Sequence, residues 1–224
     1  GENYIRLFAP RFYLPFAGRY TLAAGLSALN DQRGVPEPED AADYFQASTA
    51  IDQTRSRCIC LNSRESFDLD RDQASAPYTR IDPAAKAEYI RTQLGQRRLD
   101  YETETSPSLA QLLELLAKAH ARFERKRGEI KFRSETAIYV DLVEDRMCRI
   151  DLGDGGYQIV GRETLGTQKR YVRFTVNPRL LKWLLGGPQF AHWNNAEIGS
   201  HITFERVPNA YERGLYFCMN FFHA

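Results

Sequence analysis

The sequence predicts an α+β protein in which a short α/β N-terminal part is followed by a mostly antiparallel sheet with packed helices. Apolar residues recur at helical spacing in two segments between residues 82 and 128, and proline lies in the first turn of each. From residue 131 onward the apolar spacing changes to two, and short turns separate the segments. This change of period predicts helices first and a sheet afterwards.

The chain opens with an aromatic segment. Residues 4–16 are β-prone, are interrupted by Pro10 and Pro15, and predict a strand that runs into a tight loop. A helix is expected to begin at Ala17-Gly18, because the leucines that follow recur at helical spacing: Leu22, Leu26 and Leu29.

A second helix is expected after the Pro36-Glu37-Pro38 turn, where it carries Ala42, Tyr44 and Phe45. Residues 58–61, with the sequence CICL, predict a short buried strand. Residues 62–80 are polar and rich in turn-forming residues, which predicts a linker or a surface loop.

Two well-delimited helices follow. Asp82-Pro83 combines an N-cap with a proline in the first turn, and this helix should stop at Gly95. Ser106-Pro107 is a second pair of an N-cap residue and a proline, and it is expected to begin a longer helix that ends before Gly128. Its apolar stripe is Leu109, Leu112, Leu113, Leu116, Ala119 and Phe123. The basic residues 125–127 complement the helix dipole in an exposed last turn, in preference to forming a nucleic-acid patch.

The remaining residues predict a sheet. Alternating apolar residues in 138–142, 148–152 and 157–160, joined by the turns 144–146 and 153–156, predict an antiparallel meander. Further elements are expected in the following order: a strand at 172–176, a helix that begins at Asn177-Pro178 and ends at Gly186-Gly187-Pro188, a strand at 197–206, and a closing strand or buried helix at 215–222.

Residues 100–106 form a polar stretch between the two capped helices, and we place the domain boundary there. The expected division is a first domain of residues 1–105 and a second, α+β domain of residues 106–224. The only methionines are Met147 and Met219. Gly1 is therefore not expected to be a natural start, and we expect the chain to be part of a longer protein.

The composition excludes several classes of protein. Thirty basic and 29 acidic residues give a formal charge of +1, so no general field attracts nucleic acid or an anionic membrane. No apolar run approaches the roughly 20 residues that a membrane helix needs. The four cysteines lack zinc-finger spacing and are expected to be free thiols. We therefore expect a cytoplasmic protein with neither a nucleic-acid partner nor a membrane insertion.

Residues 192–224 concentrate groups suited to binding, including three of the four histidines. The candidate ligand-binding residues here are Trp193, Asn194, Asn195, Glu197, His201 and Arg213. The tryptophan offers a stacking surface and the two amides could fix a polar ligand, although asparagines also commonly hold loops.

The histidines and carboxylates of residues 192–224 raise two further possibilities, a metal site and a catalytic site. In a strand over 197–206, Glu197, His201 and Glu205 would share one face, but a step of four residues spans about 13 Å, too far to chelate one ion. His192 or His223 would have to complete such a site. We therefore expect no metal ligands in this chain. Neither a G-x-S-x-G elbow nor a phosphate-binding loop is recognisable, and the catalytic residues remain unassigned.

Residues 14–20 (LPFAGRY), 29–30, 36–45 and 61–63 resemble the late part of metallo-β-lactamase-fold proteins, in the branch near CMP-N-acetylneuraminate hydroxylase and Rieske-associated hydrolases. The metal motif of that superfamily, H-x-H-x-D-H, is absent. The resemblance therefore implies that the first part is the end of a metallo-β-lactamase-like fold. It also implies an upstream metal-binding domain with zinc or iron in the parent protein, and no cofactor in this chain.

Residues 107–206, with LLKWLLGG followed by WNNAEIGSH, are similar to the sterol-carrier-protein-like domain that is appended to some metallo-hydrolases. That similarity implies a module that forms an apolar tunnel or mediates dimerisation.

The first functional hypothesis is an accessory C-terminal region of a metal-dependent hydrolase or oxygenase. It would not be catalytic alone and would support the fold, substrate access or formation of a homodimer. The alternative is a lipid-like, apolar-ligand binding module whose pocket is lined by residues that would otherwise form an ordinary core: Leu112, Leu116, Phe174 and Leu184. A third possibility is an interaction module with aromatic residues at its interface: Trp193, Tyr211, Tyr216 and Phe222.

Overall fold

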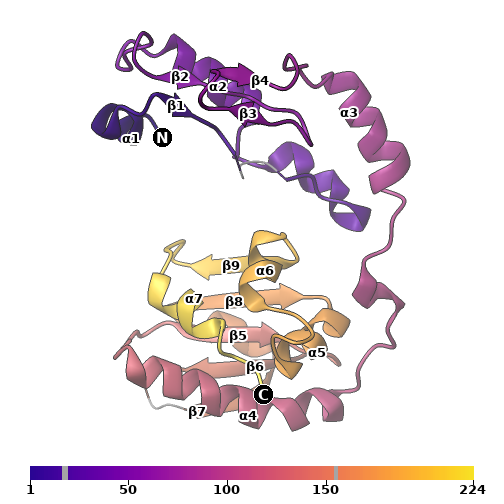
Figure 1. Cartoon of the computed structure of the whole chain (residues 1–224). Helices are drawn as coiled ribbons and strands as arrows, with labels where there is room; N and C mark the ends of the chain where they lie inside the picture. Colours follow the sequence, from indigo (N-terminus) through magenta and orange to yellow (C-terminus); the bar gives the residue numbers. More distant parts are fainter. Residues whose placement is uncertain (17–19, 154–155) are drawn as a thin grey trace. The chain divides into compact units, whose positions relative to one another are not determined.

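The computed structural model describes residues 1–16, 20–153 and 156–224 (Figure 1). The chain divides into two compact units, unit 1 (Gly1–Arg97) and unit 2 (Arg98–Ala224). The helix start expected at Ala17-Gly18, the centre of the LPFAGRY segment, and the middle of the turn expected at 153–156 lie outside the described residues. None of the helices in the described ranges has both the length and the apolar character required to cross a bilayer.

Unit 1 contains short elements. These are α1 (Glu2–Phe8), β1 (Phe12–Tyr13), the 3₁₀ helix η1 (Ala24–Gln32), α2 (Pro38–Ala47), β2 (Arg57–Cys58), β3 (Phe67–Asp68), β4 (Gln73–Ala74), α3 (Pro83–Tyr89) and the π-helical turn η2 (Ile90–Leu94). The strands β1 and β2 pair in parallel, and β3 and β4 form an antiparallel hairpin.

The long N-terminal strand expected over 4–16 is wrong, because the chain is helical to Phe8 and only Phe12–Tyr13 is extended. The rings of Tyr4 and Phe8 stack one helical turn apart, with centroids 6.3 Å from each other. Ala9 ends the helix in the left-handed region at φ 41°, directly before Pro10. Aromatic content alone therefore misidentified a helix as a strand.

The leucines expected on an α-helix lie on or beside η1 instead. The side chain of Asn30 accepts a hydrogen bond from the Leu22 N–H at 2.8 Å and donates one to the Leu22 carbonyl at 2.9 Å. A side chain that bonds nearby backbone groups competes with the regular helical pattern. The strand expected at 58–61 is also displaced, since β2 covers Arg57–Cys58 only.

Other predictions for unit 1 are confirmed. The helix after the proline turn is α2, and the side chain of Asp82 caps α3 by accepting a hydrogen bond from the Ala84 N–H at 2.9 Å. The polar segment 62–80 is a loop that contains the β3–β4 hairpin. The Asn62 side chain closes this loop through two hydrogen bonds to the backbone of Thr79.

Unit 2 has a five-stranded sheet in the order β7-β6-β5-β8-β9. Its elements are η3 (Asp100–Thr103), α4 (Leu109–Glu129), β5 (Ala137–Asp141), β6 (Arg146–Asp151), β7 (Gly156–Gly161), η4 (Arg162–Thr167), β8 (Tyr171–Val176), α5 (Pro178–Gly186), α6 (Trp193–Ile198), β9 (Ile202–Val207) and α7 (Arg213–Met219). The pair β5–β8 is parallel and the other three pairs are antiparallel. The predicted α+β class with a mostly antiparallel sheet is thus confirmed.

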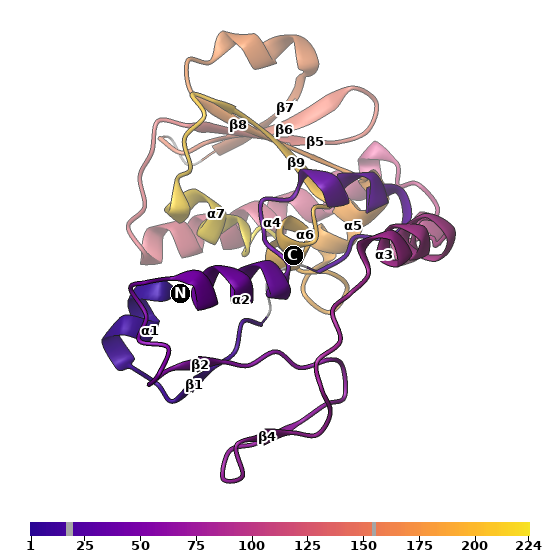
Figure 2. The same cartoon turned by 90° about the horizontal axis from the view of Figure 1, so that it is seen from above.

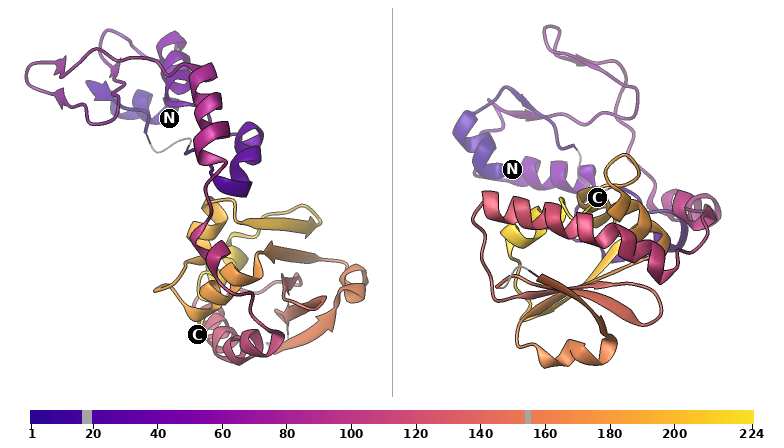
Figure 3. Two further views of the ribbon diagram at one scale, coloured as in Figure 1. Left: turned by 90° about the vertical axis from the view of Figure 1, so that its right-hand side faces the viewer. Right: turned by 90° about the horizontal axis from the view of Figure 1, so that it is seen from below.

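The two faces of this sheet are covered differently. Seen edge-on, α4, α5, α6 and α7 lie on one face, whereas η4 lies on the opposite face (Figures 2 and 3). The main core fills the helical side and contains the alternate residues of each strand, such as Ile138 and Val140 of β5. A smaller cluster of Ala137, Tyr139, Met147 and Tyr171 packs with Leu165 of η4 on the other face.

The main core contains all four residues for which the sequence left open either a pocket lining or an ordinary core. Each has at most 1% of its surface exposed: Leu112, Leu116, Phe174 and Leu184. The proposed aromatic interface is also largely wrong. Trp193, Tyr216 and Phe222 are buried in that core, and only Tyr211 of the four is exposed.

Two boundaries differ from the prediction. Helix α4 is capped by Ser108 rather than Ser106, because Ser108 and Gln111 exchange side-chain to backbone hydrogen bonds in a capping box. The strand expected at 197–206 is instead helix α6 followed by β9. For the closing element, where the sequence left a strand and a buried helix open, the structure has a helix, α7. Because Glu197 lies on α6, its predicted shared strand face with His201 and Glu205 is wrong.

Candidate functional site

A pocket of about 290 Å³ lies in unit 2 between η3, α5 and α6. One part of its wall comes from η3 and from Leu99, the residue before η3. The rest comes from α5, the α5–α6 loop, α6 and His201, the residue that precedes β9. The lining residues are Leu99, Asp100, Tyr101, Leu180, Trp183, Phe190, Ala191, His192, Asn195, Ala196 and His201. We call this the α5–α6 pocket. Its size suits a small ligand.

The local sequence explains how this wall is built. Asn177 caps α5 by accepting a hydrogen bond from the Arg179 N–H at 3.0 Å, and the helix ends at Gly187 with φ 111°. That conformation strongly favours glycine, and a Cβ there would also lie 2.9 Å from Oε1 of Gln189. The chain then turns, and His192 Nδ1 caps α6 by accepting a hydrogen bond from the Asn194 N–H at 3.2 Å.

Tyr101 and His201 form the polar corner of the pocket. The Tyr101 hydroxyl and His201 Nδ1 are 3.1 Å apart. Burial lowers the pKa of His201, with an opposing effect from the Glu102 carboxylate, and burial raises the pKa of Tyr101. Both groups are therefore neutral near pH 7, and the hydrogen bond joins a phenol to a neutral imidazole.

Gly199 fixes the position of the His201 ring. A Cβ at residue 199 would lie 2.7 Å from Cδ2 of His201 and 3.0 Å from the Asn195 carbonyl oxygen. The ring therefore occupies space that only glycine leaves open. Helix α6 ends at this residue, and Ser200 follows in the left-handed region at φ 60°. The same turn ends the helix and places the histidine against Tyr101.

The structure separates the six predicted binding residues. Asn195 and His201 line the α5–α6 pocket. Trp193 faces the core, where its Nε1–H donates to the Phe222 carbonyl at 2.8 Å. Asn194 is exposed on α6, and Arg213 is exposed at the start of α7. Glu197 is half-buried, and burial raises its pKa. Two of the six predicted residues thus lie together at this pocket, and the other four point in different directions.

Sequence reasoning missed Asp100, Tyr101, Trp183 and Phe190 as members of this pocket. Tyr101 and Trp183 are about 80 residues apart in the sequence, so no local motif connects them. The Gly186-Gly187-Pro188 stop was the available signal, because it ends α5 and begins the loop that carries Phe190, Ala191 and His192 to the pocket.

His192 and His201 line the same pocket, whereas His223 is not among its lining residues. His223 Nδ1 lies 3.0 Å from the Ala224 carbonyl, and burial lowers its pKa, with a smaller effect from Arg122. Across residues 1–16, 20–153 and 156–224, no group of three His, Cys, Asp or Glu side chains is arranged to hold a metal ion. Burial raises the pKa of Cys148 to about 12 and that of Cys218 to about 11, which disfavours their thiolate forms.

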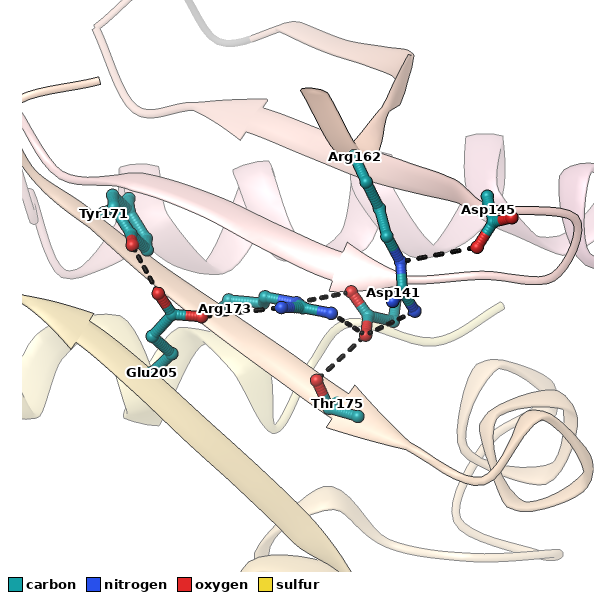
Figure 4. A network of polar contacts seen from close by, with 7 residues as sticks. All are labelled: Asp141, Asp145, Arg162, Tyr171, Arg173, Thr175 and Glu205. Carbon is teal, nitrogen blue, oxygen red and sulfur yellow. Dashed lines mark hydrogen bonds and ion pairs between the residues drawn. The ribbon is translucent and has the colours of Figure 1, made fainter. Parts of the chain in front are cut away.

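A network of polar and charged side chains lies on the face of the sheet opposite α4 (Figure 4). Asp141 of β5 is buried, and Arg173 of β8 donates to both of its carboxylate oxygens at 2.8 Å. The Thr175 hydroxyl donates to Oδ2 at 2.9 Å, and Arg162 of η4 lies 3.5 Å from the same oxygen. This bidentate pair and the additional donors supply hydrogen-bond partners to both oxygens of the buried carboxylate.

This network connects the crossover to three strands. Arg173 also lies 3.4 Å from Glu205 of β9, whose other oxygen accepts a hydrogen bond from the Tyr171 hydroxyl at 2.5 Å. Arg162 additionally pairs with Asp145 in the β5–β6 turn at 3.7 Å. The hydrogen bond to Asp141 raises the pKa of Arg173 further. Every charged group is thus already paired, and we interpret the network as structural.

The burial of His120 allows a prediction of how the free energy of unfolding of unit 2 depends on pH. This residue of α4 is buried, its Nε2 lacks a hydrogen-bond partner, and Glu124 is 3.9 Å away. Burial lowers the pKa of His120, so the unfolded chain binds more protons than the folded chain as the pH falls below about 6.5. As far as it depends on His120, the free energy of unfolding should therefore have its full value above that pH and should decline below it.

The corresponding variant is His120→Phe. Its free energy of unfolding, measured with urea at pH 7.5 and 5.5, should fall less between the two values than that of the original chain. An unchanged difference between the two pH values would assign the dependence to other groups.

Comparisons with protein-family models, with curated proteins and with solved structures found no match to this chain.

Proposed function

We propose that this chain is the accessory C-terminal region of a metal-dependent hydrolase or oxygenase of the metallo-β-lactamase superfamily. In this proposal unit 1 completes a sheet that is built mainly by an upstream metal-binding domain, and unit 2 is a sterol-carrier-like domain. The region is not catalytic alone and supports the fold, substrate access or dimerisation. The observation that carries the proposal is the open parallel strand pair of unit 1.

The β1–β2 pair is unusual for a complete sheet. The strands join in parallel through Phe12–Arg57 and Tyr13–Cys58, and they are connected by a crossover that contains η1 and α2. Neither strand pairs with a third strand in the part of the chain that the structure describes. Parallel strands normally lie inside larger sheets with both faces covered. An exposed pair of this kind provides a pairing edge for additional strands.

The surface of unit 1 supports the same conclusion. Few of its large apolar residues are buried, namely Ile5, Leu22 and Ile51. Many more are exposed, and on α1 alone Tyr4, Leu7 and Phe8 each leave more than two thirds of their surface uncovered. Exposed apolar groups at this density are typical of a surface that contacts another domain. An upstream domain of the same protein is the partner that we propose.

The element order of unit 2 supports the sterol-carrier-like part of the proposal. A long helix is followed by a three-stranded meander, a crossover, a strand, helices and a final strand. The zinc or iron of the parent protein would be held upstream, since the described residues of this chain do not offer a suitable set of ligands.

Amide hydrogen exchange tests the proposal in this chain and in a longer protein that includes the upstream domain. The N–H of Ile59 donates to the Tyr13 carbonyl at 2.9 Å, next to the open edge. Its exchange should be fast in the chain alone and about 100-fold slower in the longer protein. Val140 in the central strand β5 is the control and should exchange equally slowly in both. Equal exchange of Ile59 in both proteins would contradict the proposal.

Metal-dependent turnover provides the second test. The longer protein should hydrolyse or oxidise its substrate with zinc or iron, whereas this chain, supplied with the same metals, should not. Turnover by this chain would refute an accessory role.

A second candidate function is ligand binding by unit 2 alone. The observation that favours it is the α5–α6 pocket, which combines apolar walls with two imidazoles and an amide. This pocket shares no residue with the apolar lining that the sequence suggested, namely Leu112, Leu116, Phe174 and Leu184.

A further inference from the structure

The charge of the α5–α6 pocket limits the ligands that it accepts. Of the residues that line it within the described chain, none is lysine or arginine, and Asp100 contributes a carboxylate. The neighbouring Glu102 is close enough to affect the pKa values of both Tyr101 and His201. A phosphate or carboxylate ligand would therefore find a carboxylate, and no lysine or arginine, among these lining residues.

The walls of the pocket are mainly aromatic. The rings of Tyr101 and Trp183 meet at 90° with centroids 6.4 Å apart, and the rings of Tyr101 and His201 meet at 77° with centroids 5.7 Å apart. Phe190 adds a ring with 61% of its surface exposed. Rings at right angles form a corner, in which a bound group touches the face of one ring and the edge of another.

We propose that the α5–α6 pocket binds a small organic cation, an ammonium or quaternary ammonium group on a short body that carries a hydroxyl. The cation lies against the faces of Trp183 and Phe190, where the ring quadrupole attracts positive charge. Asp100 supplies the compensating charge. The amide of Asn195, on the exposed side of α6, is available to the hydroxyl.

The other polar groups are consistent with this ligand. Burial lowers the pKa of His201, so its imidazole is neutral near pH 7 and does not repel a cation. The Tyr101 hydroxyl is already paired with His201. The ligand therefore displaces no existing hydrogen bond of that pair.

Intrinsic fluorescence provides a direct test, because the chain has only two tryptophans. Trp183 lines the pocket, and Trp193 is buried in the core. We would titrate the full chain with choline and with 3,3-dimethylbutan-1-ol, its uncharged carbon isostere. Choline should change the Trp183 emission and bind about 10-fold more tightly than the isostere. In the Trp183→Phe variant the fluorescence change should be lost.

Matched variants separate charge from shape. Asp100→Asn should reduce the preference for choline over the isostere to about threefold, and Phe190→Ala should weaken choline binding. The control is Glu114→Gln, which removes an equal charge from an exposed position of α4 outside the pocket and should leave the preference unchanged. Both Asp100 and Phe190 are exposed, so these substitutions should not prevent folding.

The inference rests on the second candidate function and not on the role of unit 1, because every lining residue belongs to unit 2. If choline and its isostere bind equally well, the pocket is an apolar binding site and the cation proposal is overturned. If neither binds at millimolar concentration, ligand binding by this pocket is overturned as well. An equal effect of Asp100→Asn and Glu114→Gln would show that the preference is general electrostatics, which also overturns the assignment.

Discussion

Replacing Phe174 by alanine is expected to lower the free energy of unfolding of unit 2 by about 4 kcal/mol. Phe174 lies in β8 with 1% of its surface exposed, and its ring contacts those of Trp193, Phe204 and Tyr216. Removing it eliminates buried apolar surface and leaves a cavity that these large rings cannot fill without leaving their rotamers. Urea denaturation followed by tryptophan fluorescence measures the loss, since both tryptophans lie in unit 2.

Phe190→Ala is the matched control for this experiment. It deletes the same side chain from an exposed position of the same unit, and its effect should remain within about 0.5 kcal/mol. Similar losses for both variants would show that Phe174 does not occupy the centre of the core.

Replacing Asp141 by asparagine is expected to cost about 3 kcal/mol, although the two side chains have nearly the same shape. The substitution removes the charge that compensates Arg173, whose guanidinium is only 18% exposed. It also replaces one of the two acceptor oxygens with an NH₂ donor. The mostly desolvated guanidinium would then keep only the more exposed Glu205 carboxylate, 3.4 Å away, as a charged partner. The loss should appear as a lower urea midpoint with an unchanged m-value.

Two further variants separate the charge from the rest of the network. Glu205→Gln changes a carboxylate that is 48% exposed in the same network and should cost less than about 1 kcal/mol. The double variant Asp141→Asn/Arg173→Met should be less destabilised than the sum of its single variants, because it also removes the guanidinium that has lost its buried partner. Additive losses would argue against direct coupling between Asp141 and Arg173.

The sequence predicted unit 2 well where local signals agreed with one another. Helix α4, the β5–β6–β7 meander and strand β8 appear where the apolar period placed them. The turn between β5 and β6 has Glu144 and Asp145 at φ 57° and 54°, as a tight hairpin requires. Helix α5 likewise begins at the Asn177-Pro178 cap. Each of these features depends on residues that are close in the chain.

Prediction failed where the same residues suit two structures. The segment 192–206 contains alternating apolar residues, but His192 and Gly199 delimit a helix there before the strand begins. In residues 2–8 the aromatic content favours a strand, whereas the chain is helical to Phe8 and only Phe12–Tyr13 is extended. Apolar residues that alternate along the chain identify a strand only when the same segment does not also contain a helix cap and a residue that ends a helix.

The sequence by itself determined the α+β class and the order of most elements in unit 2. These properties follow from capping, periodicity and turn chemistry, which act over a few residues. Only the tertiary structure decided that Trp193 is a core residue while Trp183 faces a pocket, and that Tyr101 reaches His201 across 100 positions. Such pairings depend on how helices pack on a sheet, and the burial of each side chain is decided by neighbours that the linear sequence does not place beside it.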